Sequence, residues 1–137
     1  MICLFDACIS PRIVEALRET DEDIAHHNEH FPEGTLDPEL YPKLKERGWI
    51  LITADDHQHR KPRLKIAINK AKITAVFLCE EFTHRRRAEQ LTWIQRWWPK
   101  IARKARKAKV GTLLNVRDNG EVREVPAASR ITSHKGR

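Results

Sequence analysis

Short apolar runs alternate with amphipathic stretches along most of the chain. The clearest runs are residues 2–5, 49–53, 74–79 and 113–116, and a weaker one lies at 21–27. Continuous apolar runs of this length are typical of strands buried inside a parallel sheet. The segments 11–20, 37–47, 62–72 and 84–109 instead repeat apolar residues every three or four positions, as amphipathic helices do. This alternation predicts an α/β fold with a mostly parallel central sheet and helices on both faces.

Punctuating residues support the boundaries of these elements. Ser10 is a suitable N-cap and Pro11 suits a first helical turn, so a helix is expected from there. Asp37 is expected at the cap of the next helix with Pro38 at its first position, and Gly48 is expected to end it. The segment 28–35, which contains a proline and a glycine, is predicted to be a loop.

The C-terminal part of the chain predicts a long helix followed by a hairpin. Pro99 lies inside the 84–109 segment and is expected to kink it. Residues 118–120 read Asp-Asn-Gly, a tight-turn signal that joins the run 113–116 to a run at 122–125. Residues 127–137 are polar and basic. We therefore expect one domain over residues 1–126 and a flexible basic tail over residues 127–137.

Acidic residues follow two of the predicted strands. Asp6 comes directly after the first run, and Asp55 and Asp56 come just after the run 49–53. Asp37 begins the helix that leads into that run. Right-handed crossovers bring the carboxyl ends of parallel strands, and the helix N-termini that follow them, to one edge of the sheet. Ligands bind at this edge in open α/β sheets, so the four aspartates predict a site there, although helix capping is the alternative for each.

A cluster of carboxylates is best stabilised by a divalent cation, because the like charges otherwise repel one another. Oxygen ligands favour Mg²⁺ or Mn²⁺ over zinc. Such ions activate water and stabilise the charge that develops on a phosphodiester. The predicted site therefore has the chemistry of a metal-dependent nuclease.

Composition indicates a basic protein of a reducing compartment. The 137 residues carry a net charge of +7 with a pI near 9.6, which favours an anionic partner such as nucleic acid. Cys3, Cys8 and Cys79 show neither disulfide nor zinc spacing and are expected to be buried free thiols. The sequence shows neither a signal peptide nor an apolar run of membrane-spanning length, so a cytoplasmic protein without membrane association is expected.

Three motifs in order resemble the compact PIN-like nucleases of prokaryotic toxin-antitoxin systems, the VapC-like group. They are LFDACISPRIVEALRE, LDPELYPKLKERG and WILITADD, all in the first half of the chain. The resemblance implies a PIN-like three-layer α/β/α sandwich with a C-terminal hairpin. It also implies an Mg²⁺- or Mn²⁺-dependent endoribonuclease with an RNA substrate and a cognate antitoxin as partner. Separately, the surplus of aromatic surface on the segment 84–109 favours a second copy of the chain, as a homodimer, or the antitoxin as a partner.

The resemblance places Asp6, Asp37 and Asp55 on the metal-binding acids of that family. The family's next acid after the third strand would align with His57, which departs from the pattern. Asp56 is therefore our choice for the fourth ligand, with Glu39 as its substitute.

Basic residues follow the acids in sequence and are candidate contacts for RNA phosphates. They are Arg60, Lys61 and Arg63 in one segment and Arg85, Arg86 and Arg87 in another. A solvated helix face is the alternative interpretation of both segments. Trp93 and Trp97 lie one helical turn apart and serve either the core or a partner surface.

Two further function classes compete with the nuclease. In one, the same fold binds nucleic acid or a partner protein without chemistry, and the aspartates are helix caps. In the other, a phosphatase-like enzyme uses the acid after the first strand, but such an enzyme requires a second Asp where this chain has Cys8. A phosphate-binding loop is disfavoured because none of the five glycines clusters after the first strand.

Overall fold

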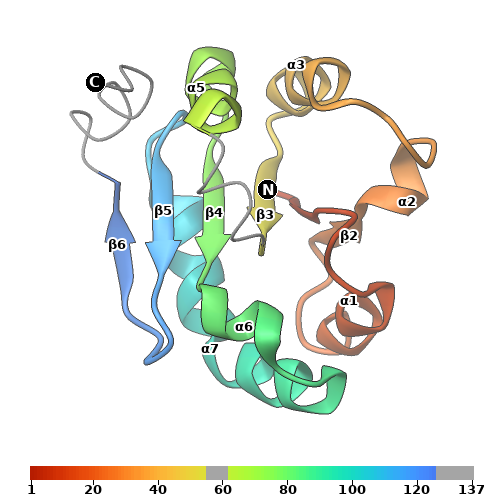
Figure 1. Cartoon of the computed structure of the whole chain (residues 1–137), viewed down its shortest axis with the longest axis vertical. Helices are drawn as coiled ribbons and strands as arrows, with labels where there is room; N and C mark the ends of the chain where they lie inside the picture. Colours follow the sequence, from red (N-terminus) through yellow and green to blue (C-terminus); the bar gives the residue numbers. More distant parts are fainter. Residues whose placement is uncertain (55–61, 126–137) are drawn as a thin grey trace.

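A six-stranded sheet forms the centre of the molecule in the computed structural model, which describes residues 1–54 and 62–125, without the side chains of Asp37 and of residues 62–65. The strand order is β2-β1-β3-β4-β5-β6, with all neighbouring pairs parallel except the antiparallel hairpin β5–β6 (Figure 1). The strands are β1 Cys3–Phe5, β2 Ile24–His26, β3 Ile50–Thr53, β4 Ala75–Leu78, β5 Leu113–Val116 and β6 Val122–Glu124.

Helices cover both faces of this sheet. The helices of the described residues are α1 Pro11–Leu17, α2 His27–His30, α3 Asp37–Arg47, α5 Pro62–Ala71, α6 Glu80–His84 and α7 Arg87–Lys107. One apolar cluster joins α1 and α7 to the sheet, and a second joins α3 and α5 to its other face. The three-layer α/β/α sandwich with a mostly parallel sheet is therefore confirmed.

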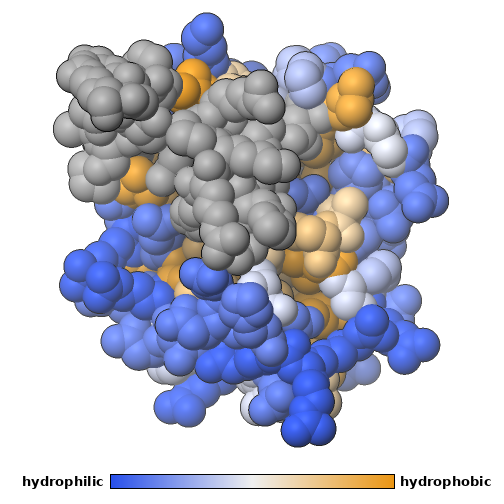
Figure 2. Space-filling model, in the orientation of Figure 1, coloured by the Kyte–Doolittle hydropathy of each residue, from blue (hydrophilic) through white to orange (hydrophobic). Residues whose placement is uncertain are grey.

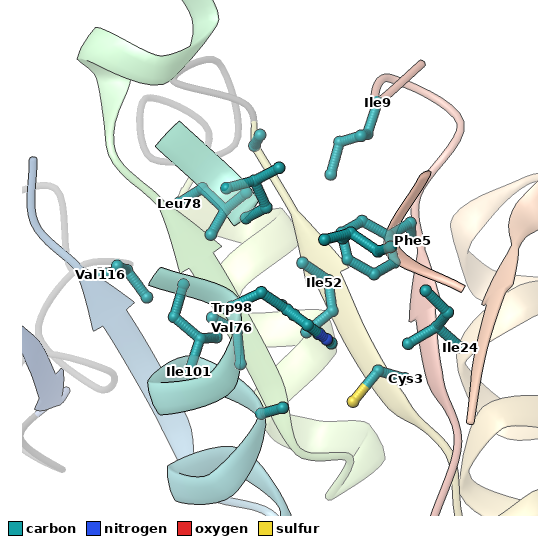
Figure 3. Packing of buried hydrophobic residues seen from close by; sticks show 14 of the residues in the cluster. Cys3, Phe5, Ile9, Ile24, Ile52, Val76, Leu78, Trp98, Ile101 and Val116 are labelled. Carbon is teal, nitrogen blue, oxygen red and sulfur yellow. The ribbon is translucent and has the colours of Figure 1, made fainter. Parts of the chain in front are cut away.

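The larger apolar cluster lies between the sheet and α7. Alternate strand residues point into it because successive side chains of a strand face opposite sides of the sheet. Phe5 and Ile52 from neighbouring strands meet Trp98 of α7, with the Phe5 and Trp98 ring centroids 5.0 Å apart (Figure 3). Trp98 is only 2% exposed, so this contact fixes where the long helix crosses the sheet.

Several predicted boundaries are confirmed. The hydroxyl of Ser10 accepts a hydrogen bond from the amide of Arg12, and α1 begins at Pro11 as expected. Gly48 ends α3 in the left-handed conformation with φ +72°, where a side chain would be strained. The weak run 21–27 does form β2, because its few apolar residues are enough to pair with the buried strand β1. The predicted C-terminal hairpin is β5–β6, and the predicted tail 127–137 lies outside the described residues.

Other local predictions were wrong. Asp37 is the first residue of α3 and Leu36 occupies the cap position. Residues 28–30 belong to the short helix α2, which a capping box between His26 and Glu29 stabilises, and not to a loop. Cys8 is exposed and Cys79 is half-buried, so only Cys3 is the buried thiol expected.

The helix predicted over 84–109 is observed with slightly narrower bounds, and a short helix that was not predicted precedes it. Residues 80–84 form the separate helix α6, and α7 begins at Arg87 after the extended residues Arg85 and Arg86. Pro99 lies within α7, which continues on both sides of it. Figure 1 shows α6 and the beginning of α7 beyond the carboxyl ends of β3, β4 and β5. In residues 1–54 and 62–125, no helix combines the length and apolar character needed to cross a membrane.

Candidate functional site

Asp6 lies at the carboxyl end of β1 in a defined orientation. Its amide donates to the carbonyl of Ile52 at 2.8 Å, which extends the pairing with β3 by one residue. One oxygen of its carboxylate, Oδ1, accepts from the amide of Ala7 at 2.8 Å. The other, Oδ2, accepts from the hydroxyl of Thr53 at 3.1 Å. Hydrogen bonds to a charged acceptor are stronger than neutral ones, so these two donors hold the carboxylate at the sheet edge.

Thr53 was not predicted as part of the site. It is the last residue of β3, is fully buried, and places its hydroxyl between the Asp6 carboxylate and the Cys8 thiol, 3.7 Å away. The sequence does carry a signal for a supporting residue of this kind. Thr53 is a polar residue at the end of an otherwise apolar strand, just before a pair of acids.

His26 holds the loop that follows Asp6. Its Nδ1 accepts a hydrogen bond from the amide of Asn28 at 3.1 Å, so in the neutral ring the proton lies on Nε2. Nε2 then donates to the carbonyl of Ile9 at 2.7 Å, and the amide of Ile9 donates to the carbonyl of Asp6. His26 is 1% exposed. The end of β2 therefore supports the backbone that carries the aspartate.

The structure gives less information on the other predicted metal ligands. Asp55 and Asp56 follow Ala54 at the end of β3 but lie outside the described residues. Asp37 begins α3, and its side chain is also outside the described part; Figure 1 shows α3 over the half of the sheet where β3 begins. Glu39, the substitute, is exposed in the first turn of α3. The convergence of these acids on Asp6 stays a prediction.

No metal cluster is visible in the part of the chain that the structure describes. There, no group of three or more His, Cys, Asp or Glu side chains converges as metal ligands would. Asp6 is accordingly, within residues 1–54 and 62–125, the one of the four predicted aspartate ligands whose side-chain contacts are seen.

The basic segment 85–87, between α6 and the first residue of α7, lies at the carboxyl edge of the sheet. Arg85 is ion-paired with Asp118, whose hydrogen bond raises the pKa of the guanidinium, and it stacks 5.9 Å from the Trp93 ring. Arg86 and Arg87 are exposed. Figure 2 shows hydrophilic side chains over α6 and the beginning of α7. Arg60 and Lys61 lie outside the described residues, as does the side chain of Arg63.

A polar hollow of about 570 Å³ opens at the carboxyl ends of β4 and β5. Glu81, Asn115 and Arg117 are among its lining residues. The side-chain oxygen of Asn115 is buried and has no hydrogen-bond partner among the described residues. Polar groups therefore lie at or just after the ends of β1, β3, β4 and β5, although the sequence analysis singled out only the first two of these strands.

Charges at the opposite edge have a structural role. The Asp21 carboxylate accepts hydrogen bonds from Arg106 of α7 and from the indole of Trp98. Burial alone would raise the pKa of Asp21, but these hydrogen bonds hold its pKa below the ordinary value. Nearby, burial raises the pKa of the Cys3 thiol to about 12, so this thiol stays protonated. The hydrogen bonds of Arg106 to Asp21 therefore hold α7 on the sheet.

Comparison with known proteins gives a match to a protein family. No curated protein and no solved structure matches the chain. The family model described as a PIN like domain matches residues 1–80. This segment begins before β1 and ends just after β4, and so contains Asp6, Thr53 and the segment with Asp55 and Asp56. PIN-like domains are generally nucleases. More than half of the chain is matched, and its α/β/α architecture agrees, so this protein belongs to the PIN-like domain family and has a nuclease-type fold.

Proposed function

We propose that this protein is a metal-dependent endoribonuclease that hydrolyses RNA phosphodiesters. The observation that carries the proposal is the Asp6 carboxylate, oriented at the carboxyl end of β1 by the Thr53 hydroxyl and the Ala7 amide. A carboxylate that served only as a helix cap would be held by amides of the following helix. Asp6 instead accepts from the neighbouring strand, which turns it toward the sheet edge where α/β ligands bind.

The residues present fit a hard divalent cation. Asp6, Asp37, Asp55 and Asp56 offer oxygen atoms only, the donor set that Mg²⁺ and Mn²⁺ prefer. A carboxylate has several lone-pair sites, so one that accepts hydrogen bonds, as Asp6 does from Ala7 and Thr53, can also bind a cation. Such hydrogen-bonded support of a metal ligand is a usual feature of metal sites.

When bound, the cation supplies an activated water and stabilises the charge that develops on the phosphodiester. The protein's own groups would position this chemistry. Thr53 and His26 hold the aspartate and its loop in place. Arg86 and Arg87, exposed at the same edge, would bind the phosphates of the RNA strand. The net charge of +7 favours association with such a polyanion.

The biological role that we propose is the toxin of a prokaryotic toxin-antitoxin pair. The motif resemblance in the first half of the chain supports it. The partners would be a cognate antitoxin and a second copy of the chain, and the protein would act in the cytoplasm. Induced expression should arrest growth, and the Asp6→Asn variant should not.

The decisive experiment is cleavage of a mixed single-stranded RNA pool by the purified protein with Mg²⁺ or Mn²⁺ and with EDTA. An Asp6→Asn/Asp55→Asn variant is assayed beside it, with its fold verified by circular dichroism. Metal-dependent cutting that the variant lacks would support the proposal. If the wild-type protein neither cuts RNA nor binds Mn²⁺ in calorimetry, the alternative of a catalytically inactive binding module replaces it.

A further inference from the structure

Two separate hollows lie between α7 and the β5–β6 hairpin, on the face of the sheet opposite α3 and α5, and together we call them the α7–hairpin groove. One, of about 720 Å³, is lined by Trp93, Arg96 and Trp97 together with the hairpin turn. The other, of about 460 Å³, is lined by Arg103, Lys104 and Lys107 together with β5 and β6. The first hollow also contains Arg85, so the groove begins at the carboxyl edge that carries the candidate active site.

Cations of α7 follow this groove along its length. Arg96, Lys100, Arg103 and Lys107 are separated by four, three and four residues, which places them on one face of the helix. They span about 16 Å along the helix axis at about 1.5 Å per residue. Residues 90–107 include no aspartate or glutamate. The repulsion within such a stripe is most simply relieved by an anion that runs along it.

Trp97 provides a flat aromatic surface in the middle of the stripe. It is half-buried, with Arg96 stacked 4.8 Å and Lys100 5.8 Å from its ring. One face of the ring packs against Gly120 of the hairpin turn, where an added Cβ would lie only 2.2 Å from it, so a base can stack only on the other face. Trp93 beside it is fixed by a hydrogen bond from its indole to the carbonyl of Asp118 at 2.8 Å. The platform is therefore held rigidly by the hairpin.

Glu89, Asp118 and Glu121, near the first hollow, have basic partners, and Glu124 lines the second hollow beside the stripe. Asp118 is paired with Arg85, and Glu121 is paired with Arg123. Glu89 accepts from the amide of Arg86 at the start of α7. The charge left along the stripe is positive. Aromatic platforms within a cationic groove are the usual means of binding single-stranded nucleic acid without sequence preference.

We propose that the α7–hairpin groove is a binding site for single-stranded RNA, in which a base stacks on Trp97 and the phosphates contact Arg96, Lys100, Arg103 and Lys107. The choice of RNA rests on the proposed function. The site lies outside the proposed metal-binding acids and meets the segment 85–87 only at Arg85, and it extends the substrate surface from the carboxyl edge along α7. An acidic protein partner is the competing occupant.

The test measures binding of fluorescein-labelled oligo(U) RNA by fluorescence anisotropy in EDTA across a salt series, so that cleavage plays no part. One variant removes three stripe charges, Lys100→Gln/Arg103→Gln/Lys107→Gln. Its control, Lys43→Gln/Lys70→Gln/Lys72→Gln, removes three exposed charges from the opposite face. Each phosphate contact contributes about 0.7 to the slope of log K against log salt, so the stripe variant should lower the slope by about 2. The control should leave it unchanged.

A second variant, Trp97→Leu, tests stacking separately from charge. We expect roughly five- to a hundredfold weaker binding with an unchanged salt slope, because stacking on an aromatic ring does not involve counterions. Equal losses in the stripe variant and its control, or RNA affinity that neither groove variant alters, would overturn the proposal. Groove-dependent binding by a protein that cuts no RNA would instead refute the nuclease and keep the groove.

Discussion

Removing the Thr53 hydroxyl tests whether the neighbouring strand orients Asp6. Thr53→Val replaces the hydroxyl with a methyl group of similar size inside a strand where β-branched residues are favoured. The lost hydrogen bond, 3.1 Å long, is donated to a charged acceptor and is worth about 1.5–3 kcal/mol. Asp6 is half-buried and keeps its bond from Ala7, so water can compensate in part. We therefore expect a loss of about 1–2 kcal/mol in the free energy of unfolding, somewhat below the range for such bonds.

Urea unfolding followed by tryptophan fluorescence measures this loss. With a denaturant slope of about 2 kcal/mol/M for a domain of this size, the midpoint should fall by about 0.5–1 M. The affinity for Mn²⁺, measured by calorimetry, should fall by about tenfold or more, as when a residue that supports a metal ligand is removed. Thr53→Ser, which keeps the hydroxyl, should restore most of the affinity.

Thr74→Val is the matched control. Thr74 is also a buried threonine, but its hydroxyl accepts from the amide of Gly111 at the opposite edge of the sheet. This variant should lose stability and keep its metal affinity. If Thr53→Val retains both its urea midpoint and its Mn²⁺ affinity, the hydroxyl does not orient Asp6 and the reasoning fails.

Two further predictions concern the scaffold. Hydrogen bonds from Arg18 and from the amide of His26 lower the pKa of Glu29 from 4.5 to about 2, despite the opposing effect of burial. The stability that Glu29 contributes is thus present above pH 4.5 and lost as the pH falls toward 2. The Glu29→Gln variant should therefore be less stable than the wild type at neutral pH and lose less stability between pH 4.5 and 2. An acid titration followed by circular dichroism measures both differences. Gly120→Ala should lower the free energy of unfolding by about 2–4 kcal/mol in thermal unfolding, because φ at this residue is +83° and the added Cβ would meet Trp97. Gly34→Ala has a similar φ of +84° but lies in open space, so it should lower the free energy of unfolding by only about 1 kcal/mol. Equal costs at the two glycines would show that the Trp97 contact is not rigid.

The fold was predictable where a helix or strand is determined by residues that are close together in the sequence. The apolar runs at 2–5 and 74–79 are too short for buried helices, and a sheet covered on both faces removes their consecutive apolar side chains from water. Ser10 and Gly48 set helix ends through their own backbone and side-chain preferences. The short helix α6 escaped prediction, because residues 80–84 contain a single apolar side chain, Phe82, and so show no helical spacing of their own.

The candidate site likewise contains one residue that the sequence predicts and others that only the folded structure reveals. Asp6 was predicted from its position after a strand, which the sequence alone reveals. Thr53 and His26 were missed as its supports because they are distant from Asp6 in the sequence and approach it only through the pairing of β1 with β3 and of β2 with β1. The exposure of Cys8 likewise depends on how the loop after β1 is held and not on its apolar neighbours.

The sequence by itself determined the order of the six strands and the four longer helices, the parallel sheet and the edge at which Asp6 lies, because each depends on the spacing of residues near one another. Composition alone determined the positive charge of the chain. Only the tertiary structure decided which hydroxyl holds the aspartate and that the tryptophans and cations of α7 line a groove against the hairpin. The physical reason is that a hydrogen bond or a groove requires two segments at a particular distance. That distance is set by the packing of the whole core, to which every element contributes at once.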